Sequence, residues 1–306
     1  MLTAARAEGR LLGLRIDVDT HDGMRDGVPR LLETLGAHAA RGTFFLSMGP
    51  DRSGLAALNL LRPGFLAKMR RTRAASLYGW RTMLSGTLLP ARPVATAFPD
   101  LARRIVAEGH EAGVHAWDHR RWQDRLDRMS PGEIALHLDR GREAFAAIFG
   151  VLPRTFAAPA WLTNDAALLH QEGLDLAFGS DCRGTEPFLP EVEGRALHTP
   201  QVPTTLPTLD EALGDRFGTA LAFFDATLAE VLLAPWPVLT VHAEAEGGPY
   251  AGDFGEFLGR ASQADVRVVT LGELLESRLA TGEPLLARPL VTSPVPGRHG
   301  RVSRPR

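Results

Sequence analysis

Two aspartates stand two positions apart, Asp17 and Asp19, at the end of an apolar run that begins at Leu11. Alternate residues of a β-strand point to the same face, so this spacing predicts that the two carboxylates lie side by side. Such a pair repels unless a cation or a shared proton relieves it. The pattern therefore indicates either a cation site or a pair of aspartates that cap a loop.

Two histidines close another predicted strand, residues 112–116, in the order His-Ala-Trp-Asp-His. The spacing of His115 and His119 predicts two imidazoles on one face of a helical turn, where they can chelate a metal. This spacing alone is a weak signal, but active sites in parallel α/β folds are built at the carboxyl ends of strands. An aspartate and two histidines with open coordination positions are typical of a catalytic divalent-metal site.

A third titratable group, His242, ends the apolar run 237–241. A histidine in this place is commonly a hydrogen-bonded residue at the rim of a sheet, although here a rigid strand supports it. The sequence has no GxSxG elbow, no Walker A loop and no GxGxxG turn, and its single cysteine, Cys182, excludes an internal disulfide and a PCxxC zinc site. The sequence therefore does not favour a serine hydrolase, a nucleotidase or a dinucleotide-dependent enzyme.

The elements that must position these groups alternate between strand and helix six or seven times. Period-2 and buried apolar runs predict strands over 11–19, 43–47, 112–116, 155–158, 176–179, 238–241 and 266–270. Helical spacing and caps predict helices over 28–40, 99–108, 131–149, 165–172, 219–233, 254–264 and 271–279. This alternation favours a parallel α/β fold, either a barrel or a doubly wound sheet.

The 306 residues carry 34 lysines and arginines against 36 aspartates and glutamates, a net charge of −2. The balance is uneven, because segment 52–99 holds eight cations and no acid, which indicates an anionic partner. Residues 1–10 are an N-terminal extension, and residues 284–306, rich in proline, glycine and arginine, are predicted to be a disordered basic tail. We find no secretory signal and no apolar run of about 18 residues, so we expect a cytoplasmic protein without a membrane span.

Seven segments carry a resemblance to a known family. They are residues 14–33, 44–51, 75–80, 111–119, 180–184, 201–211 and 240–247. With these segments, which span roughly residues 11–280, the chain resembles the polysaccharide deacetylase (NodB-homology) family. Within that family it is similar to deformylases that act on a formamido sugar carried by undecaprenyl phosphate.

The resemblance implies an α/β fold, a distorted (β/α) barrel over residues 11–283. It implies a divalent metal ion, Zn, Mn or Co, held by Asp19, His115 and His119, with Asp17 as general base and His242 as general acid. The family's adjacent aspartates are here separated by one residue, and segment 157–161 lacks the arginine that braces the base. Arg183 is a candidate to replace that arginine, to contact a substrate phosphate or to serve a structural role.

The resemblance also implies a substrate with a phosphodiester at a membrane surface. The candidate substrate-binding residues are Arg183, Asp181, Trp161, Tyr78 and Trp80, and the candidates for lipid phosphate are Lys68, Arg70, Arg71, Arg73 and Arg81. Segment 52–99 is then a basic amphipathic insertion on an anionic membrane, at the cytoplasmic face of the bacterial inner membrane. The alternative is a solvated insertion packed on the acidic remainder of the protein.

The expected activity is removal of a formyl group from a lipid-linked 4-formamido sugar. The product would carry 4-amino-4-deoxy-L-arabinose for lipid A modification and resistance to cationic antimicrobial peptides. Two alternatives stay open: an N-deacetylase of another amino sugar or cell-wall glycan, and a sugar-lipid binding protein without catalysis. We expect no nucleic-acid partner, and the sequence does not fix the oligomeric state.

Overall fold

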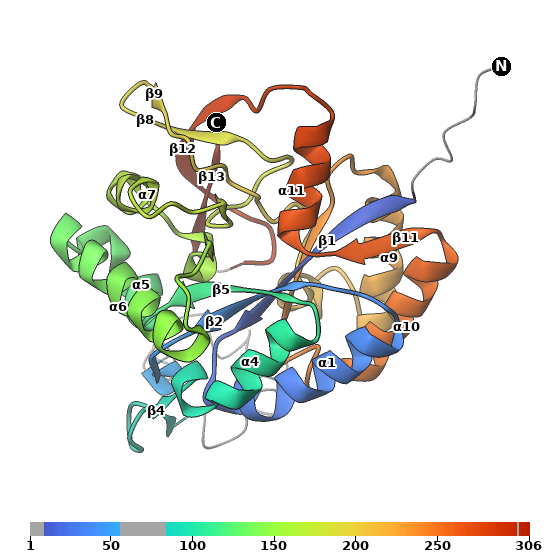
Figure 1. Cartoon of the computed structure of the whole chain (residues 1–306). Helices are drawn as coiled ribbons and strands as arrows, with labels where there is room; N and C mark the ends of the chain where they lie inside the picture. The colour runs from blue at the N-terminus through green and yellow to red at the C-terminus, as the bar shows by residue number, and fades with distance from the viewer. Residues whose placement is uncertain (1–8, 56–83, 299) are drawn as a thin grey trace.

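A seven-stranded sheet, curled into a partial barrel, forms the centre of the protein (Figure 1). The computed structural model describes residues 9–55, 84–298 and 300–306. The strands are β1 (Arg10–Val18), β2 (Thr43–Ser47), β5 (Glu111–Ala116), β6 (Thr155–Phe156), β7 (Phe178–Gly179), β10 (Val238–His242) and β11 (Val266–Val269). They pair in parallel in the order β10-β1-β2-β5-β6-β7, and β11 also pairs with β1. The predicted barrel-like α/β fold is confirmed.

Strand β1 is the central strand, and residues 12–18 within it are all buried. Its first half pairs with β11, and its second half pairs with β10 up to the register pair Asp17 and His242. Because a parallel strand covered on both faces is expected to be almost wholly apolar, the charged residues Arg15 and Asp17 are exceptions that require partners.

Helices cover the outer face of the sheet (Figure 1). They are α1 (Val28–Ala37), α4 (Pro99–Ala107), α6 (Pro131–Phe149), α7 (Asp165–Glu172), α9 (Ala220–Leu233), α10 (Ala251–Gln263) and α11 (Leu271–Ala280), with the short α5 (His119–Arg125) and α8 (Leu209–Ala212). The predicted capping box at Ser130 and Glu133 begins α6, and Gly150 ends it in the left-handed conformation that glycine favours. Helix α6 packs against β5, and α11 packs against β1.

The C-terminal segment is ordered, so the prediction of a disordered tail is wrong. Strands β12 (Ala287–Pro294) and β13 (Arg301–Pro305) pair with each other, and β12 pairs with β8 (Leu189–Val192), which pairs with β9 (Arg195–Ala196). Val302 and Ser303 are buried, whereas Arg301 and Arg304 on either side of them are exposed. The proline and arginine content suggested disorder. However, β13 pairs with β12 and buries Val302 and Ser303 between its exposed arginines.

The described ends of the basic segment form a small two-stranded sheet and join the core of the protein. Strand β3 (Pro50–Asp51) pairs with β4 (Arg92–Pro93), and Val94 and Ala95 lie fully buried in the core. The insertion is therefore shorter than the predicted segment 52–99. Residues 56–83 lie outside the described residues, and they include Lys68, Arg70, Arg71, Arg73, Tyr78, Trp80 and Arg81.

Residues 1–8 of the predicted N-terminal extension also lie outside the described residues, and β1 begins at Arg10, inside that predicted extension. Over the described ranges, no helix is both long enough and apolar enough to cross a bilayer.

Candidate active site

Three strands of the sheet bring the chemically capable residues to one edge. Asp17 lies near the end of β1, with Asp19 directly after that strand, and His115 lies in β5. His242 ends β10 and is the register neighbour of Asp17. His119 is the first residue of α5, so the predicted helical turn is wrong: the two histidines lie across a junction between a strand and a helix. The carboxyl ends of parallel strands gather these residues, as the sequence predicted.

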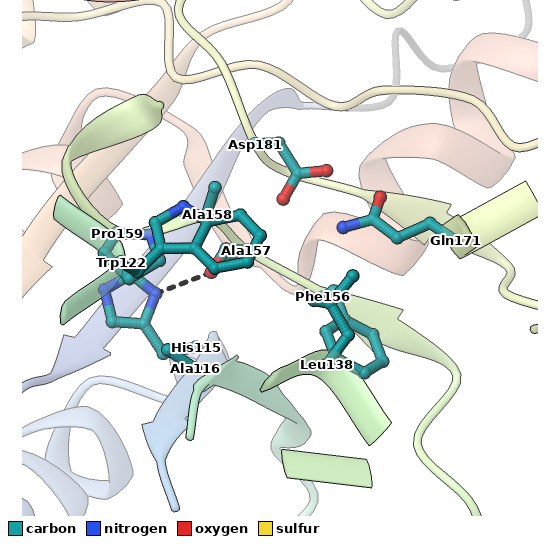
Figure 2. A pocket seen from close by; sticks show the side chains of 10 residues that line it. All are labelled: His115, Ala116, Trp122, Leu138, Phe156, Ala157, Ala158, Pro159, Gln171 and Asp181. Atoms are coloured by element: carbon teal, nitrogen blue, oxygen red, sulfur yellow. Dashed lines mark hydrogen bonds between the residues drawn. The ribbon is translucent and has the colours of Figure 1, made fainter. Parts of the chain in front are cut away.

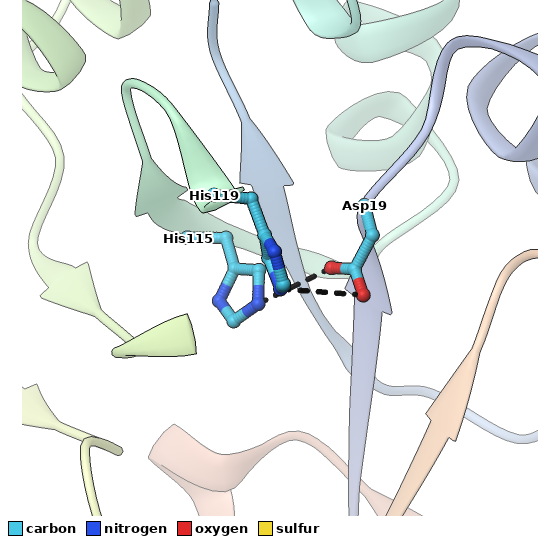
Figure 3. A group of neighbouring side chains, drawn as sticks. All are labelled: Asp19, His115 and His119. Atoms are coloured by element: carbon cyan, nitrogen blue, oxygen red, sulfur yellow. Dashed lines mark ion pairs between the residues drawn. The ribbon is translucent and has the colours of Figure 1, made fainter. Parts of the chain in front are cut away.

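Asp19, His115 and His119 form a cluster whose ligand atoms all lie within 4.8 Å of one another (Figure 3). The Nε2 atom of His115 lies 3.2 Å from Asp19 Oδ1, and the Nε2 atom of His119 lies 3.5 Å from Asp19 Oδ2. Burial would raise the pKa of Asp19, but the electrostatic interactions with His119, His115 and His242 outweigh burial and hold the pKa well below its usual value. Asp19 is therefore ionised.

The protonation of His115 tests whether these residues fit a cation. Its Nδ1 atom lies 2.8 Å from the carbonyl oxygen of Ala157, and because a carbonyl only accepts, Nδ1 carries the proton (Figure 2). In the neutral ring, the Nε2 lone pair then faces the carboxylate of Asp19. Within the described part of the chain, Asp19 Oδ1 is buried without a hydrogen-bond partner. His115 Nε2 and Asp19 Oδ1 are thus two acceptors that face each other with no donor between them. A divalent cation bound between them would satisfy both.

Arg15 braces Asp17, a role that was not predicted from the sequence. The Nε and Nη2 atoms of Arg15 donate to the two carboxylate oxygens of Asp17 at 2.7 and 2.8 Å. Both side chains are buried. Burial would raise the pKa of Asp17, but the charge of Arg15 and the hydrogen bonds from Arg15 outweigh burial and lower the pKa. The available signal was a charged residue two positions before Asp17, on the same face of an apolar strand.

The sequence of this chain matches proteins of a known family. A family model described as polysaccharide deacetylase matches residues 18–178. The chain is 38% identical over 266 residues to the probable 4-deoxy-4-formamido-L-arabinose-phosphoundecaprenol deformylase ArnD of Shewanella sediminis (strain HAW-EB3), covering 87% of this chain and 86% of that protein. This chain belongs to the polysaccharide deacetylase family. It is a hydrolase that acts on a linear amide C–N bond.

A second relative agrees with this assignment, and a solved structure shares the fold. The polysaccharide deacetylase described here is 30% identical over 284 residues to the probable ArnD deformylase of Wigglesworthia glossinidia brevipalpis, covering 92% of this chain and 97% of that protein. Its fold matches the structure described as "putative polysaccharide deacetylase from Mycobacterium smegmatis" with a TM-score of 0.63 at 20% identity, covering 95% of this chain and 97% of that one.

His242 lies among carboxylates on the other side of Asp17. Burial would lower the pKa of His242, but the charges of Asp19, Asp210 and Asp17 outweigh burial and raise the pKa to about 9. Its backbone N–H donates to Glu246 Oε2 at 2.8 Å. A protonated imidazole beside an ionised Asp17 provides one proton donor and one proton acceptor at the same edge of the polysaccharide deacetylase barrel.

Glu244 fixes the loop that carries Asp19, a role that was likewise not predicted from the sequence. Its Oε1 atom accepts hydrogen bonds from the backbone N–H of Asp19 at 3.1 Å, and from the N–H and hydroxyl of Thr20 at 2.8 and 2.7 Å. Burial raises the pKa of Glu244 to about 7. One bond holds the backbone of Asp19 and two hold Thr20 beside it, so Glu244 orients the loop that carries a ligand.

Arg183 does not replace the missing arginine. Its Nη1 atom donates to both carboxylate oxygens of Glu211 at 2.9 and 3.0 Å, and its Nη2 atom donates to the carbonyl of Leu206 at 2.8 Å. Arg15 occupies the bracing role at Asp17, so that expectation for Arg183 is wrong.

The other described candidates lie inside the protein. Asp181 is fully buried and accepts a hydrogen bond from Gln201 at 3.1 Å, which contradicts the expectation that it contacts substrate. It lines a small cavity behind His115, together with Gln171, and burial raises its pKa (Figure 2). Trp161 is 2% exposed, and its indole N–H donates to Thr204 Oγ1 at 2.8 Å. Both residues support the site from behind.

The ends of the basic segment are tied to the loops that carry the ion site. Arg52 lies 3.1 Å from Asp118, the buried residue that caps α5 just before His119. Arg92 donates to both carboxylate oxygens of Asp22 at 2.9 and 3.0 Å, three residues after Asp19. These two cations of the segment therefore have intramolecular partners.

We expect Arg15→Lys to slow turnover and to move the acidic limb of the pH–rate profile to higher pH. Lysine keeps the charge but loses the two parallel hydrogen bonds, so the pKa of Asp17 rises toward its ordinary value. Arg15→Met, which leaves Asp17 buried and unpaired, should lower the free energy of unfolding by about 3–5 kcal/mol.

The check is a pH–rate profile of Arg15→Lys beside a denaturation curve of Arg15→Met. Arg267→Lys is the matched control, because Arg267 is an exposed arginine on the neighbouring strand β11. An Arg15→Lys profile that coincides with the wild-type profile would remove Arg15 from the control of Asp17.

Proposed function

We propose that this polysaccharide deacetylase removes the formyl group from an undecaprenyl-phosphate-linked 4-deoxy-4-formamido-L-arabinose. The names of the two ArnD relatives, which match over most of their lengths, support this substrate. The observation that carries the chemistry is the placement of Asp17 beside the Asp19, His115 and His119 cluster, with His242 in register next to it. This arrangement suits hydrolysis of an amide.

Asp17 and His242 have opposite roles in proton transfer. Asp17, ionised and oriented by Arg15, accepts the proton of the attacking water. His242 donates a proton to the amine that leaves. Asp19, His115 and His119 would hold a divalent metal ion, which supplies polarisation of the amide carbonyl and acidification of water when bound. Zn, Mn and Co all suit this donor set.

Mass spectrometry of a purified formamido-sugar lipid, before and after incubation with the protein, tests the activity. We expect the mass to fall by one CO unit and formate to accumulate in equal amount. Addition of a chelator should stop both changes. If only the matching acetamido sugar lipid is hydrolysed, the protein is an N-deacetylase instead. If neither lipid changes in the metal-loaded protein, the non-catalytic alternative replaces the proposal.

The biological role follows from the substrate. The product would be a 4-amino-4-deoxy-L-arabinose carrier, whose added amine lowers the negative charge of lipid A and so weakens binding of cationic antimicrobial peptides. The carrier lipid lies in a membrane, so the protein would work as a peripheral protein at the cytoplasmic face of the inner membrane. The basic segment is the candidate contact with that surface.

We expect the protein to pellet with anionic lipid vesicles at low salt and to release them as salt rises. Each lysine or arginine near an anionic surface contributes about 1 kcal/mol, and the attraction fades beyond a Debye length of about 8 Å at physiological salt. Charge reversal at Lys68, Arg70, Arg71 and Arg73 should weaken vesicle binding and turnover of the lipid-linked sugar.

The matched control reverses the charge of exposed arginines away from this segment, Arg301 and Arg304 of β13. The same segment variant should barely change hydrolysis of a short, water-soluble formamido sugar. If it co-sediments like the wild type at low salt, the segment packs within the protein and the membrane contact lies elsewhere.

A further inference from the structure

A small cavity lies behind the ring of His115 (Figure 2). Leu138 and Phe156 form part of its apolar wall, and two polar side chains, Asp181 and Gln171, also line it. The cavity gives the centre of a water molecule about 10 Å³, which is close to the space that one water needs. A wholly apolar cavity would stay dry, but the two polar side chains make this cavity a site for a polar molecule.

Both polar side chains present an acceptor atom that lacks a donor. Within the described ranges, Asp181 Oδ1 and Gln171 Oε1 are buried and have no hydrogen-bond partner. The two residues are 0% and 2% exposed, so bulk solvent does not reach these atoms. A carboxylate oxygen and an amide oxygen only accept, so neither can satisfy the other. One water molecule, which has two donors, would satisfy both.

The carboxyl group of Asp181 is held in place on its other side. Gln201 Nε2 donates to Asp181 Oδ2 at 3.1 Å, and the backbone N–H of Asp181 donates to Gln201 Oε1 at 2.9 Å. A Cβ atom at Gly179 would lie 2.4 Å from Gln201 Nε2 and 2.9 Å from Asp181 Oδ2, so a side chain there would push this pair apart. The orientation of Asp181 is therefore fixed by a reciprocal pair of hydrogen bonds.

Asp181 lies against the segment that follows the neighbouring strand β6. Strands β6 and β7 pair in parallel, and the N–H of Ser180 donates to the carbonyl of Phe156 at 2.8 Å. The residues that come next, 157–158 and Asp181, line the same cavity. Burial raises the pKa of Asp181, and the backbone N–H of Ala158 is among the hydrogen-bond donors that oppose this rise. The carboxyl group thus faces that N–H.

The peptide unit between Ala157 and Ala158 joins Asp181 to His115. Its carbonyl oxygen, from Ala157, accepts the Nδ1 proton of His115 at 2.8 Å, and its N–H, from Ala158, faces Asp181. Hydrogen bonds in a chain polarise one another, so a carboxylate at the N–H end strengthens the carbonyl at the other end as an acceptor. A stronger acceptor at Nδ1 makes Nε2 a better metal ligand and fixes the orientation of the ring.

We propose that Asp181 is a positioning residue for the metal ligand His115. It acts through the peptide unit 157–158, and one bound water in the cavity joins it to Gln171. The proposal rests on the metal site of the proposed function and does not depend on the substrate. Because Asp181 is fully buried, it acts on the ion site from behind and has no contact with substrate.

Zinc binding, measured by competition with a chromophoric chelator, tests the proposal without any turnover. Asp181→Asn keeps the shape of the side chain and can donate to Gln171, but it removes the charge. We expect the Kd for zinc to rise about tenfold, as is typical when an outer partner of a metal ligand is lost. Glu172→Gln is the matched control and should bind zinc like the wild type. Glu172 also accepts backbone N–H bonds, from His198 and Thr199, but outside the ion site.

NMR of the metal-free protein separates positioning of His115 from a general loss of stability. The Nδ1 proton of His115, identified by its absence in His115→Gln, should move upfield in Asp181→Asn because its hydrogen bond to Ala157 weakens. The same signal should stay in place in Glu172→Gln. Thermal melting shows whether each variant is folded. If Asp181→Asn does not fold, Gln171→Met takes its place, since it removes the other contact of the water and should also raise the Kd for zinc.

Two results would overturn the role of Asp181. One is equal zinc affinity in wild type and Asp181→Asn. The other is a weaker affinity with an unmoved His115 signal, because Asp181 would then act on the stability of the fold alone. A crystal structure should show a solvent peak within hydrogen-bond distance of Asp181 Oδ1 and Gln171 Oε1, and its absence would overturn the water link.

The proposed function can fail separately. If the wild type binds zinc with the expected dependence on Asp181 but does not hydrolyse the formamido lipid, the deformylase assignment falls and the role of Asp181 stands. If the lipid is hydrolysed and Asp181→Asn binds zinc like the wild type, the deformylase stands and the role of Asp181 falls. A wild type that binds no divalent metal overturns both the metal site and this proposal.

Discussion

Asp17→Asn should abolish measurable turnover while the metal stays bound. General acid–base groups typically contribute about 10²–10⁴-fold to rate, and an amide at this position cannot accept the proton of water. His242→Ala should cause a loss of similar size, because the leaving amine then has no positioned donor. Neither side chain belongs to the Asp19, His115 and His119 cluster, so metal content should remain near that of the wild type.

Turnover and metal content must be measured on the same preparations. His198→Ala is the matched control, because the His198 side chain is 93% exposed and pairs with Glu172 outside the cluster. If His242→Ala hydrolysed the lipid substrate at the wild-type rate, the proton donor would be another group. If Asp17→Asn lost its metal together with its activity, Asp17 would be a ligand and the base would have to be sought elsewhere.

Asp19→Ala, His115→Ala and His119→Ala should each purify with little metal and no activity. Structural-grade metal sites contribute about 10–16 kcal/mol, so the loss of one of three protein ligands should weaken affinity by several kcal/mol. Asp19→Ala should have the largest effect, because its two oxygens face one histidine each.

Elemental analysis after dialysis against trace metal decides the ligand assignment. Full occupancy in all three variants would show that the ion, if one binds, lies elsewhere. Partial occupancy restored by excess metal, with activity recovering in proportion, is the outcome expected of a weakened but intact site.

Much of the fold and site was predictable because it depends on local patterns. The strand ends that present Asp17, His115 and His242 follow from apolar runs that stop at polar residues, and parallel pairing brings such ends together. The roles of these residues came from family resemblance, since the same spacing also suits loop caps and rim histidines.

The partners of these residues could not be predicted from local patterns. Arg183 meets Glu211 across 28 positions, and Glu244 reaches Thr20 across 224. Such contacts depend on how loops close over the sheet, which no local period encodes. The C-terminal hairpin was missed for a related reason: its strand β12 pairs with β8, which precedes it by about a hundred positions, and composition alone cannot anticipate that partner.

The position of Arg15 on the same strand as Asp17 has a consequence for how this enzyme can change. A base and its brace two residues apart on a central strand keep their relative geometry whatever the surrounding loops do. The loop after β6 is thereby released from supplying that brace. Side-chain changes in that loop that keep the Ala157 carbonyl against His115 could retarget the enzyme toward another amide while the proton-accepting pair is inherited intact, so new specificities could be screened without rebuilding the catalytic base.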